Sequence, residues 1–334
     1  DGEAHPLLST EDEFADYETW ESSNLAGTLA KTEDMLQYEY ARPALKLGLK
    51  LGKQTGANPY KFGMIGASDT HTALATTREE NYFGKYKSAE PGPDRHDTEV
   101  VPAQDPSLKV FASQELASGL TAVWARENTR GEIFGAMKRK EVYATTGTRI
   151  RVRVFAGWDF EADEVTRPDF IAQGYRRGVP MGGELRKAPD GKAPSFMIRA
   201  LRDPDGANLD RIQVIKGWLD EKGETHERIY DVAVSDGRKV GNDGRVKEPV
   251  GNTVDLATAT YTNTIGAAIL GAHWVDPDFD PNEDAFYYVR VLEIPTPRWT
   301  TYDAAFYGID LPDNVPATIQ DRAYTSPIWY TPKS

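Results

Sequence analysis

The sequence predicts an α/β segment over residues 1–147 and a β-rich, sandwich-like domain over residues 148–334. Three observations support this division. A helical pattern at 41–55 precedes a short apolar run that leads into Asp69-Thr70-His71. From about residue 148 the apolar residues recur with a period of two, which is typical of half-buried strands. The chain also exceeds the roughly 100–200 residues of one domain.

The composition excludes several classes of protein. With 39% hydrophobic residues, and with 7 Trp, 16 Tyr and 12 Phe, the chain is not mainly disordered. No apolar run reaches the roughly 18 residues of a membrane span. The net charge of −13 is opposite to the basic patches of general nucleic-acid-binding proteins, so no nucleic-acid partner is expected. Without cysteine there are no disulfides, thiolate metal sites or cysteine nucleophiles.

The first elements follow from local patterns. Residues 41–55 predict a helix, because Pro43 fits its first turn, apolar residues recur at helical spacing, and Gly56 can end it. The run 61–66 is apolar without alternation, which predicts a short strand buried on both faces. Residues 84–108 carry four prolines and predict a loop, and the loop at 80–105 is long enough to act as a lid.

The later elements are one helix and several strands. Thr129 and Glu132 form a capping-box pattern that begins a helix over 130–140. Alternation then predicts strands, and a Glu-Lys-Gly-Glu turn at 221–224 predicts a hairpin between the third and fourth of them. The expected strands cover residues 149–154, 195–201, 212–218, 228–234 and 286–292.

Asp69 and His71 form the sharpest candidate site. A strand followed at once by Asp-x-His would place a carboxylate and an imidazole at the carboxyl end of the strand, where α/β barrels carry catalytic groups. Both groups are suitable ligands for Zn²⁺, Mn²⁺ or Fe²⁺. The alternative is that Asp69 caps a helix and His71 is an ordinary polar neighbour.

The count of candidate ligands limits this interpretation. His5, close to Glu3, is a second candidate; the other histidines are His96, His226 and His273. A catalytic metal takes about three protein ligands, so Glu3, His5, Asp69 and His71 could serve one metal but hardly several. The chain has no His-x-His pair. If it is a metallohydrolase, some of its ligands are missing from these 334 residues.

Two other patterns have plainer interpretations. The alternating carboxylates at 276–280 suggest a calcium loop, but Pro281 and Tyr287 stand where an EF-hand needs Gly and Glu, which favours an acidic turn before a strand. Arg149, Arg151 and Arg153 share one face of a strand, and pairing with nearby acids is favoured over an anion site.

Residues 58–71 resemble part of the C-terminal half of bacterial proteins called the domain of unknown function 3604 family. That family is in turn similar to the PHP (polymerase and histidinol phosphatase) metallohydrolases. Further blocks make the resemblance span essentially the whole chain: residues 3–6, 12–16, 80–85, 124–130, 143–147, 178–183, 286–292, 297–299, 316–320 and 326–330.

The resemblance implies that residues 1–147 are the C-terminal portion of a PHP-like distorted (β/α) barrel. Family members are nearly twice as long, and their N-terminal half carries the His-x-His strand that this chain lacks. By resemblance, Asp69 and His71 match the closing Asp-x-His metal motif. Glu3 and His5 lie in a stretch that follows an earlier barrel strand. Residues 148–334 would be an appended β-sandwich.

These observations lead to a functional hypothesis. The chain would contribute to a metal-dependent hydrolase of an ester bond, a phosphoester above all, that uses a metal-activated water. Asp69, His71, His5 and Glu3 are the candidate metal ligands; Glu80, Tyr82 and Arg126 are candidate catalytic residues. Glu80 and Tyr82 would orient substrate or metal-bound water. Arg126 and Arg130 could bind an anionic group, but a structural ion pair with Glu127 or Glu132 is favoured.

The partners and the alternative follow from the same resemblance. The expected partners are the missing N-terminal half of the same protein and a small anionic ester substrate, with a homo-oligomer left open. The family suggests a periplasmic or otherwise exported protein, although no signal peptide is present in this sequence. The alternative is a non-catalytic module whose sandwich binds a glycan or a partner.

Overall fold

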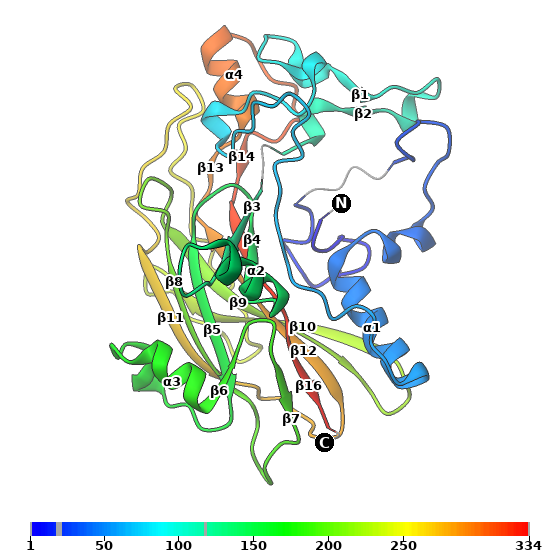
Figure 1. Cartoon of the computed structure of the whole chain (residues 1–334). Coiled ribbons are helices and arrows are strands. Elements are labelled where there is room, and N and C mark those ends of the chain that lie inside the picture. The colour runs from blue at the N-terminus through cyan, green and yellow to red at the C-terminus, as the bar shows by residue number, and fades with distance from the viewer. Residues whose placement is uncertain (1, 18–21, 117–118, 333–334) are drawn as a thin grey trace.

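The computed structural model describes residues 2–17, 22–116 and 119–332, and its architecture is mainly β-sheet (Figure 1). An eight-stranded sheet has the order β10-β9-β12-β15-β4-β3, with β16 added to β12 and β7 added to β16. Its strands are β3 (Leu120–Val123), β4 (Val142–Thr145), β7 (Glu184–Arg186), β9 (Leu209–Leu219), β10 (Thr225–Val234), β12 (Asp284–Glu293), β15 (Arg322–Thr325) and β16 (Ile328–Thr331).

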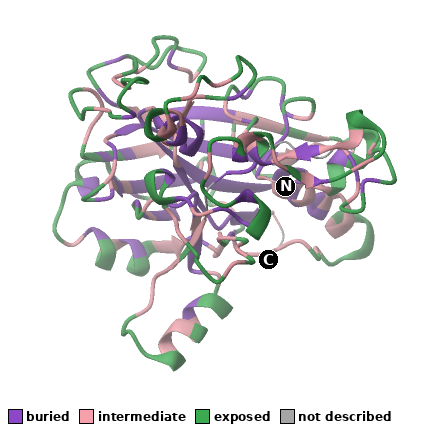
Figure 2. Ribbon diagram, turned by 90° about the horizontal axis from the view of Figure 1, so that it is seen from above, coloured by how far each residue is buried: buried purple, intermediate pink, exposed green. Residues whose placement is uncertain are grey.

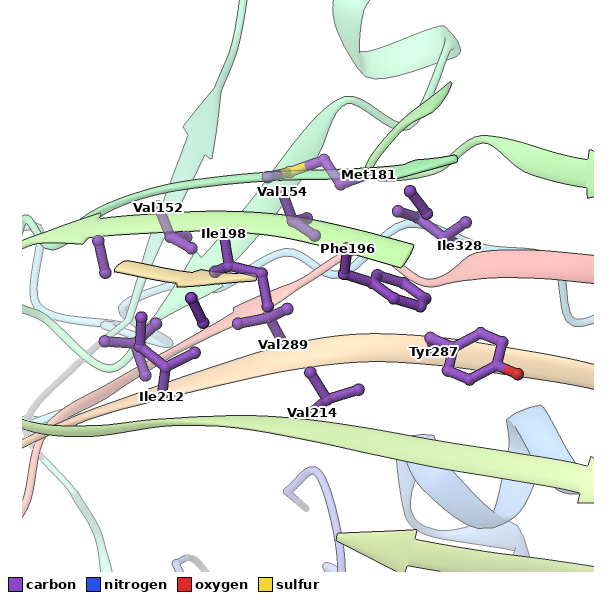
Figure 3. Close-up of a cluster of buried hydrophobic side chains, with 14 of the residues drawn as sticks. Val152, Val154, Met181, Phe196, Ile198, Ile212, Val214, Tyr287, Val289 and Ile328 are labelled. Atoms are coloured by element: carbon purple, nitrogen blue, oxygen red, sulfur yellow. The ribbon is translucent and has the colours of Figure 1, made fainter. Parts of the chain in front are cut away.

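A four-stranded sheet, in the order β11-β8-β5-β6, packs against the larger one. The core between them comes from the alternating apolar residues of both sheets, among them Val152, Ile198, Val214 and Val289 (Figure 3). This is the packing of a β-sandwich. The strands are β5 (Arg151–Gly157), β6 (Gly178–Pro180), β8 (Ser195–Leu201) and β11 (Ile269–Val275).

Helix α1 (Ala41–Thr55) covers the opposite face of the larger sheet (Figure 1). Leu45 and Leu49 of the helix pack against Ile215 and Phe286, which alternate with the residues of the sandwich core. The central strands are therefore buried on both faces, and the exposed residues gather in the loops and outer helices (Figure 2). Gly56, with φ of 82°, ends α1 in the left-handed conformation, as the sequence predicts.

The remaining elements lie around the two sheets. A short pair, β1 (Glu99–Val101) with β2 (Val110–Phe111), lies near α4 (Trp299–Tyr307) in Figure 1. A second short pair joins β13 (Thr296–Pro297) to β14 (Thr318–Ile319). The two other α-helices are α2 (Arg130–Lys138) and α3 (Phe170–Arg177).

Most of the predicted elements are confirmed. The helix at 41–55 has the predicted bounds, and α2 begins where the capping pattern places it, with the Thr129 hydroxyl accepting a hydrogen bond from the Glu132 amide. The five predicted strands correspond to β5, β8, β9, β10 and β12. The hairpin is confirmed as well, because β9 pairs with β10 in antiparallel register across the turn.

The barrel is not supported. In the described ranges, strands pair in antiparallel fashion except β16 with β7, whereas a (β/α) barrel needs successive parallel strands with helical crossovers. The predicted buried strand at 61–66 belongs to neither sheet, and Ile65 within it is 62% exposed. The predicted boundary after residue 147 falls inside one sheet, because β4 pairs with β15.

Two buried arginines attach the N-terminal segment to the sheet. Arg42 of α1 and Arg290 of β12 are both fully buried. Arg42 contacts Glu3 at 2.5 Å, Asp12 at 2.6 Å and Glu227 at 2.9 Å. Arg290 contacts the same Asp12 at 2.6 Å and Glu3 at 3.2 Å. Burial raises the pKa of Asp12, but Arg290 and Arg42 outweigh it and hold that pKa far below its usual value.

Replacing Arg42 with Met should lower the free energy of unfolding by about 3–5 kcal/mol, because buried carboxylates lose their partner. Urea denaturation measures this change. The control is Lys50→Met on the same helix, which removes an ion pair to the exposed Glu224 and should cost at most about 1 kcal/mol. Equal losses in the two variants would contradict a structural role for the network.

Candidate functional site

The segment 61–71 passes β3, an edge strand of the larger sheet, at residues 66 and 67. The Ala67 carbonyl accepts a hydrogen bond from the Gly119 amide at 3.0 Å, and the Thr121 hydroxyl donates to the Gly66 carbonyl at 2.7 Å. A Cβ at Gly66 would lie 2.7 Å from the Leu120 carbonyl oxygen, so only glycine permits this approach. The segment therefore delivers Asp69 and His71 at the edge of the sheet.

Asp69 and His71 are both exposed at the end of this segment. Asp69 has φ of 51°, in the left-handed region that non-glycine residues rarely adopt. Its carboxylate lies 3.6 Å from the Lys85 ammonium and is 52% exposed. The His71 ring stacks on Tyr86 with 4.6 Å between the ring centroids, and the His71 amide donates to the Lys85 carbonyl at 2.8 Å. Residues 85 and 86 thus orient both predicted ligands.

A charged neighbourhood surrounds this pair. Burial, followed by the carboxylates of Asp69 and Glu115, raises the pKa of Tyr86, and the nearby Lys85 lowers it. Lys85 is 5% exposed and Glu115 is fully buried. Lys85, Tyr86 and Glu115 were not predicted from the sequence as site residues. The available signal was that Lys85 closes a block, residues 80–85, that resembles the family.

The four predicted metal ligands are not brought together. Across the ranges that the structure describes, no three side chains of His, Cys, Asp or Glu form a group that could hold a metal ion. His5 is 9% exposed, its Nδ1 accepts from the Leu7 amide at 3.1 Å, and its ring packs on Tyr40. In these ranges Asp69 and His71 therefore have no third candidate ligand beside them.

Glu3 has a different role from the predicted one. Its carboxylate is paired with both Arg42 and Arg290, and it also accepts a hydrogen bond from the Tyr288 hydroxyl. A carboxylate held by two buried arginines is not available to a metal ion, so we remove Glu3 from the candidate ligands. The sequence analysis assigned Glu3 by its closeness to His5 and could not show its partners near residue 290.

The predicted catalytic residues lie in three different settings. Tyr82 is 5% exposed and packs between Trp299 and Arg95, which makes it part of a small core. Burial, followed by the Glu115 carboxylate, raises its pKa above the usual range. Arg126 is exposed in the turn between β3 and α2. Glu80 is about half exposed, lies 3.1 Å from Arg78, and lines a cavity.

That cavity, of about 340 Å³, lies between the loop at 77–80 and the ends of β12 and β15. Glu293 and Asp321 are neighbours on these two chain segments, because the Glu293 amide donates to the Asp321 carbonyl at 2.8 Å. Their side chains accept hydrogen bonds from Thr148 and Thr146, each at 2.6 Å. The sequence analysis did not identify this carboxyl pair.

The surroundings of Glu293 and Asp321 favour the protonated form of their carboxyl groups. Burial, followed by the Asp321 carboxylate, raises the pKa of Glu293 well above its usual value. Burial also raises the pKa of Asp321 to about 6, despite the hydrogen bond from Thr146. Like charges close to each other repel, so a proton on either carboxyl group reduces the repulsion between them.

The two remaining sequence patterns are structural. In the acidic turn, Asp276 is paired with Lys216, Asp278 with Arg228, and Asp280 accepts from the Asn282 amide. These contacts agree with an acidic turn before β12. Of the three arginines at 149, 151 and 153, Arg149 pairs with Asp203 and Arg153 pairs with Glu141, each at 3.0 Å. These ion pairs agree with the predicted pairing with nearby acids.

Comparison with known proteins adds one match. A family model described as "Protein of unknown function (DUF3604)" matches residues 1–332. No curated protein matches the chain. Within the described ranges, none of the helices is both long enough and apolar enough to cross a membrane.

The Asp321 carboxyl predicts a pH-dependent stability. Its pKa is about 6 in the folded chain and about 3.9 when unfolded, so its stabilising contribution is complete below about pH 4 and is lost as the pH rises through about 6. The side chain of Asp321→Asn cannot ionise, so this variant does not lose stability in that pH range. Relative to wild type, its free energy of unfolding should rise by up to about 3 kcal/mol between about pH 4 and pH 8.

Urea unfolding at a series of pH values measures this difference. Asp310→Asn, at an exposed position, is the matched control and should show no such gain. A difference between Asp321→Asn and wild type that stays constant with pH would contradict the assigned protonation.

Proposed function

Because the chain belongs to this family of proteins of unknown function, we propose on chemical grounds that it is the C-terminal part of a metal-dependent hydrolase of an ester bond, above all a phosphoester. The observation that carries the proposal is the exposed pair Asp69 and His71. One loop presents both side chains, and the contacts of residues 85 and 86 orient them without burying them.

The donor set suits part of a metal site. A carboxylate and an imidazole are suitable ligands for zinc, manganese or iron, and a catalytic site needs about three protein ligands. Asp69 and His71 would supply two of them. We propose that the rest come from the N-terminal half of a longer protein, in which residues 1–147 would complete a PHP-like barrel. His5 stays a candidate ligand.

The surface beside the pair supports a missing partner segment. Ile65 is 62% exposed and Leu74 is 52% exposed, so apolar side chains flank Asp69 and His71 on both sides in sequence. Burial of such apolar side chains against another segment would be favourable. In this proposal the N-terminal half covers both and brings the missing ligands to the same place.

Several residues of this chain would serve the reaction. A bound divalent metal would polarise the substrate and lower the pKa of a bound water. The Lys85 ammonium, 3.6 Å from Asp69, would attract the anionic ester toward the site, and Tyr86 would hold the imidazole of His71 by stacking. Arg126 is exposed and could bind a second anionic group of the substrate.

The structure modifies the other proposed catalytic roles. Glu80 lines the cavity with Glu293 and Asp321, and we propose that it contacts a polar part of the substrate there rather than a metal-bound water. Tyr82 is packed in a small core, so we assign it to support of the loop. An exported, periplasmic location remains part of the proposal, as does a small anionic ester as substrate.

Asp69→Ala combined with His71→Ala should remove both metal and activity from the full-length product of the gene. Metal content by mass spectrometry should fall below one equivalent. Hydrolysis of p-nitrophenyl phosphate and its diester should fall more than about 100-fold, because loss of a group that only supports a metal ligand already costs about 10–100-fold. Asp255→Ala, at an exposed site, is the control and should leave both unchanged.

Two results would overturn the proposal. One is a full-length product that purifies without stoichiometric metal, which would favour the non-catalytic glycan- or partner-binding module. The other is a double variant as active as wild type. The 334-residue chain alone should be inactive, and activity in it would contradict the claim that ligands are missing.

A further inference from the structure

A buried lysine and a buried aspartate meet between the two sheets of the sandwich. Lys216 lies on β9 of the larger sheet, and Asp276 directly follows β11 of the smaller sheet. The Lys216 Nζ is 2.7 Å from the Asp276 Oδ2, and each residue is only 2% exposed. Neither residue belongs to the proposed metal site.

Further hydrogen bonds hold the Lys216 ammonium and the Asp276 carboxylate in place. The Lys216 Nζ also donates to the Asp278 carbonyl at 2.7 Å. On the other side, Asp276 Oδ2 accepts from the Tyr287 hydroxyl at 2.7 Å, and Asp276 Oδ1 accepts from the Asp278 amide at 3.0 Å. Burial, followed by the Asp276 carboxylate, raises the pKa of Tyr287 well above its usual value, so this hydroxyl keeps its proton.

Aromatic rings surround the pair. The Lys216 Nζ lies 5.1 Å from the centre of the Trp218 ring and 6.0 Å from that of Tyr287. Tyr287 in turn contacts Phe196 and Trp274, and it lies at one end of the sandwich core near Phe196 (Figure 3). The site is therefore poor in water, which would otherwise hydrate both charges and hydrolyse any bond formed between them.

We propose that Lys216 and Asp276 form an intramolecular amide bond, which joins the two sheets covalently. Two features favour the reaction. Both groups are buried, and an amide removes the two charges that would otherwise have to be kept out of water. A fixed contact also replaces a bimolecular encounter with an intramolecular one, which is worth many orders of magnitude in rate.

The reaction balances without any co-reactant. One proton passes from the Lys216 ammonium to the Asp276 carboxylate and gives an amine and a carboxylic acid. The amine lone pair attacks Asp276 Cγ, and the N–Cγ bond forms. One Cγ–O bond then breaks, and its oxygen takes a second proton from the nitrogen. The products are a secondary amide, which keeps one N–H, and one molecule of water.

The bond would have a structural purpose. β11 is an edge strand that pairs with β8 alone in its sheet, and its end carries Asp276. An amide to β9 would close the chain between residues 216 and 276 and would prevent this edge from separating from the larger sheet. A chain without cysteine has no disulfide for this purpose.

Mass spectrometry of the folded full chain tests the proposal. The wild type should weigh about 18 Da less than its sequence predicts, because one water is lost. Tryptic digestion should give a joined peptide that contains both Lys216 and Asp276, with no cleavage after Lys216. Lys216→Arg should have the full mass of its sequence. Lys192→Arg, the control in an exposed pair with Asp159, should show the same loss as wild type.

Peptide mapping distinguishes the amide bond from succinimide formation, which also releases one water. Aspartates that precede glycine can form succinimides of the same mass, and this chain has such residues at Asp1, Asp190, Asp205, Asp236 and Asp243. A loss mapped to one of these residues, or a folded wild type with its full sequence mass, would overturn the proposal. The wild-type map decides the question even if Lys216→Arg does not fold.

Discussion

The ion network of Arg42 and Arg290 determines where the N-terminal part of the chain lies. Each arginine is fully buried, and both contact Glu3 and Asp12. Buried charges are tolerated only when each is closely paired, so the N-terminal segment and α1 must meet β12 at this place. Since α1 leads into residues 61–71, the same network sets the path that carries Asp69 and His71 to the edge of the sheet.

Local patterns predicted much of the sandwich. On β9 and β12, alternate residues point into two different cores. One face of these strands packs in the sandwich, and the other packs against α1, so the period of two is still visible in the sequence. Gly56 and Thr129 marked helix ends correctly, since capping depends on residues close in sequence. The prediction of a strand at 61–66 was wrong because an apolar run does not show that the segment pairs with a sheet.

The candidate site was predicted only in part. Asp69 and His71 are close in sequence, so the pattern could reveal them. Glu3 was assigned to a metal because nothing near it in sequence indicates Arg290, and Glu293 meets Asp321 only because two distant segments lie side by side. Lys85 lay in a recognised block, yet its position beside Asp69 depends on a turn of the loop that no local pattern predicts.

The distribution of charge separates structural from functional acids. Glu3 and Asp12 are acids with paired cations beside them, and each is almost completely buried. Asp69 is the contrast, because it is half exposed and its lysine contact is long. A carboxylate that stabilises a fold should be buried with its partner, whereas one that binds an incoming cation must stay accessible. By this criterion Asp69 belongs with the proposed metal site, and Glu3 and Asp12 belong to the framework that positions it.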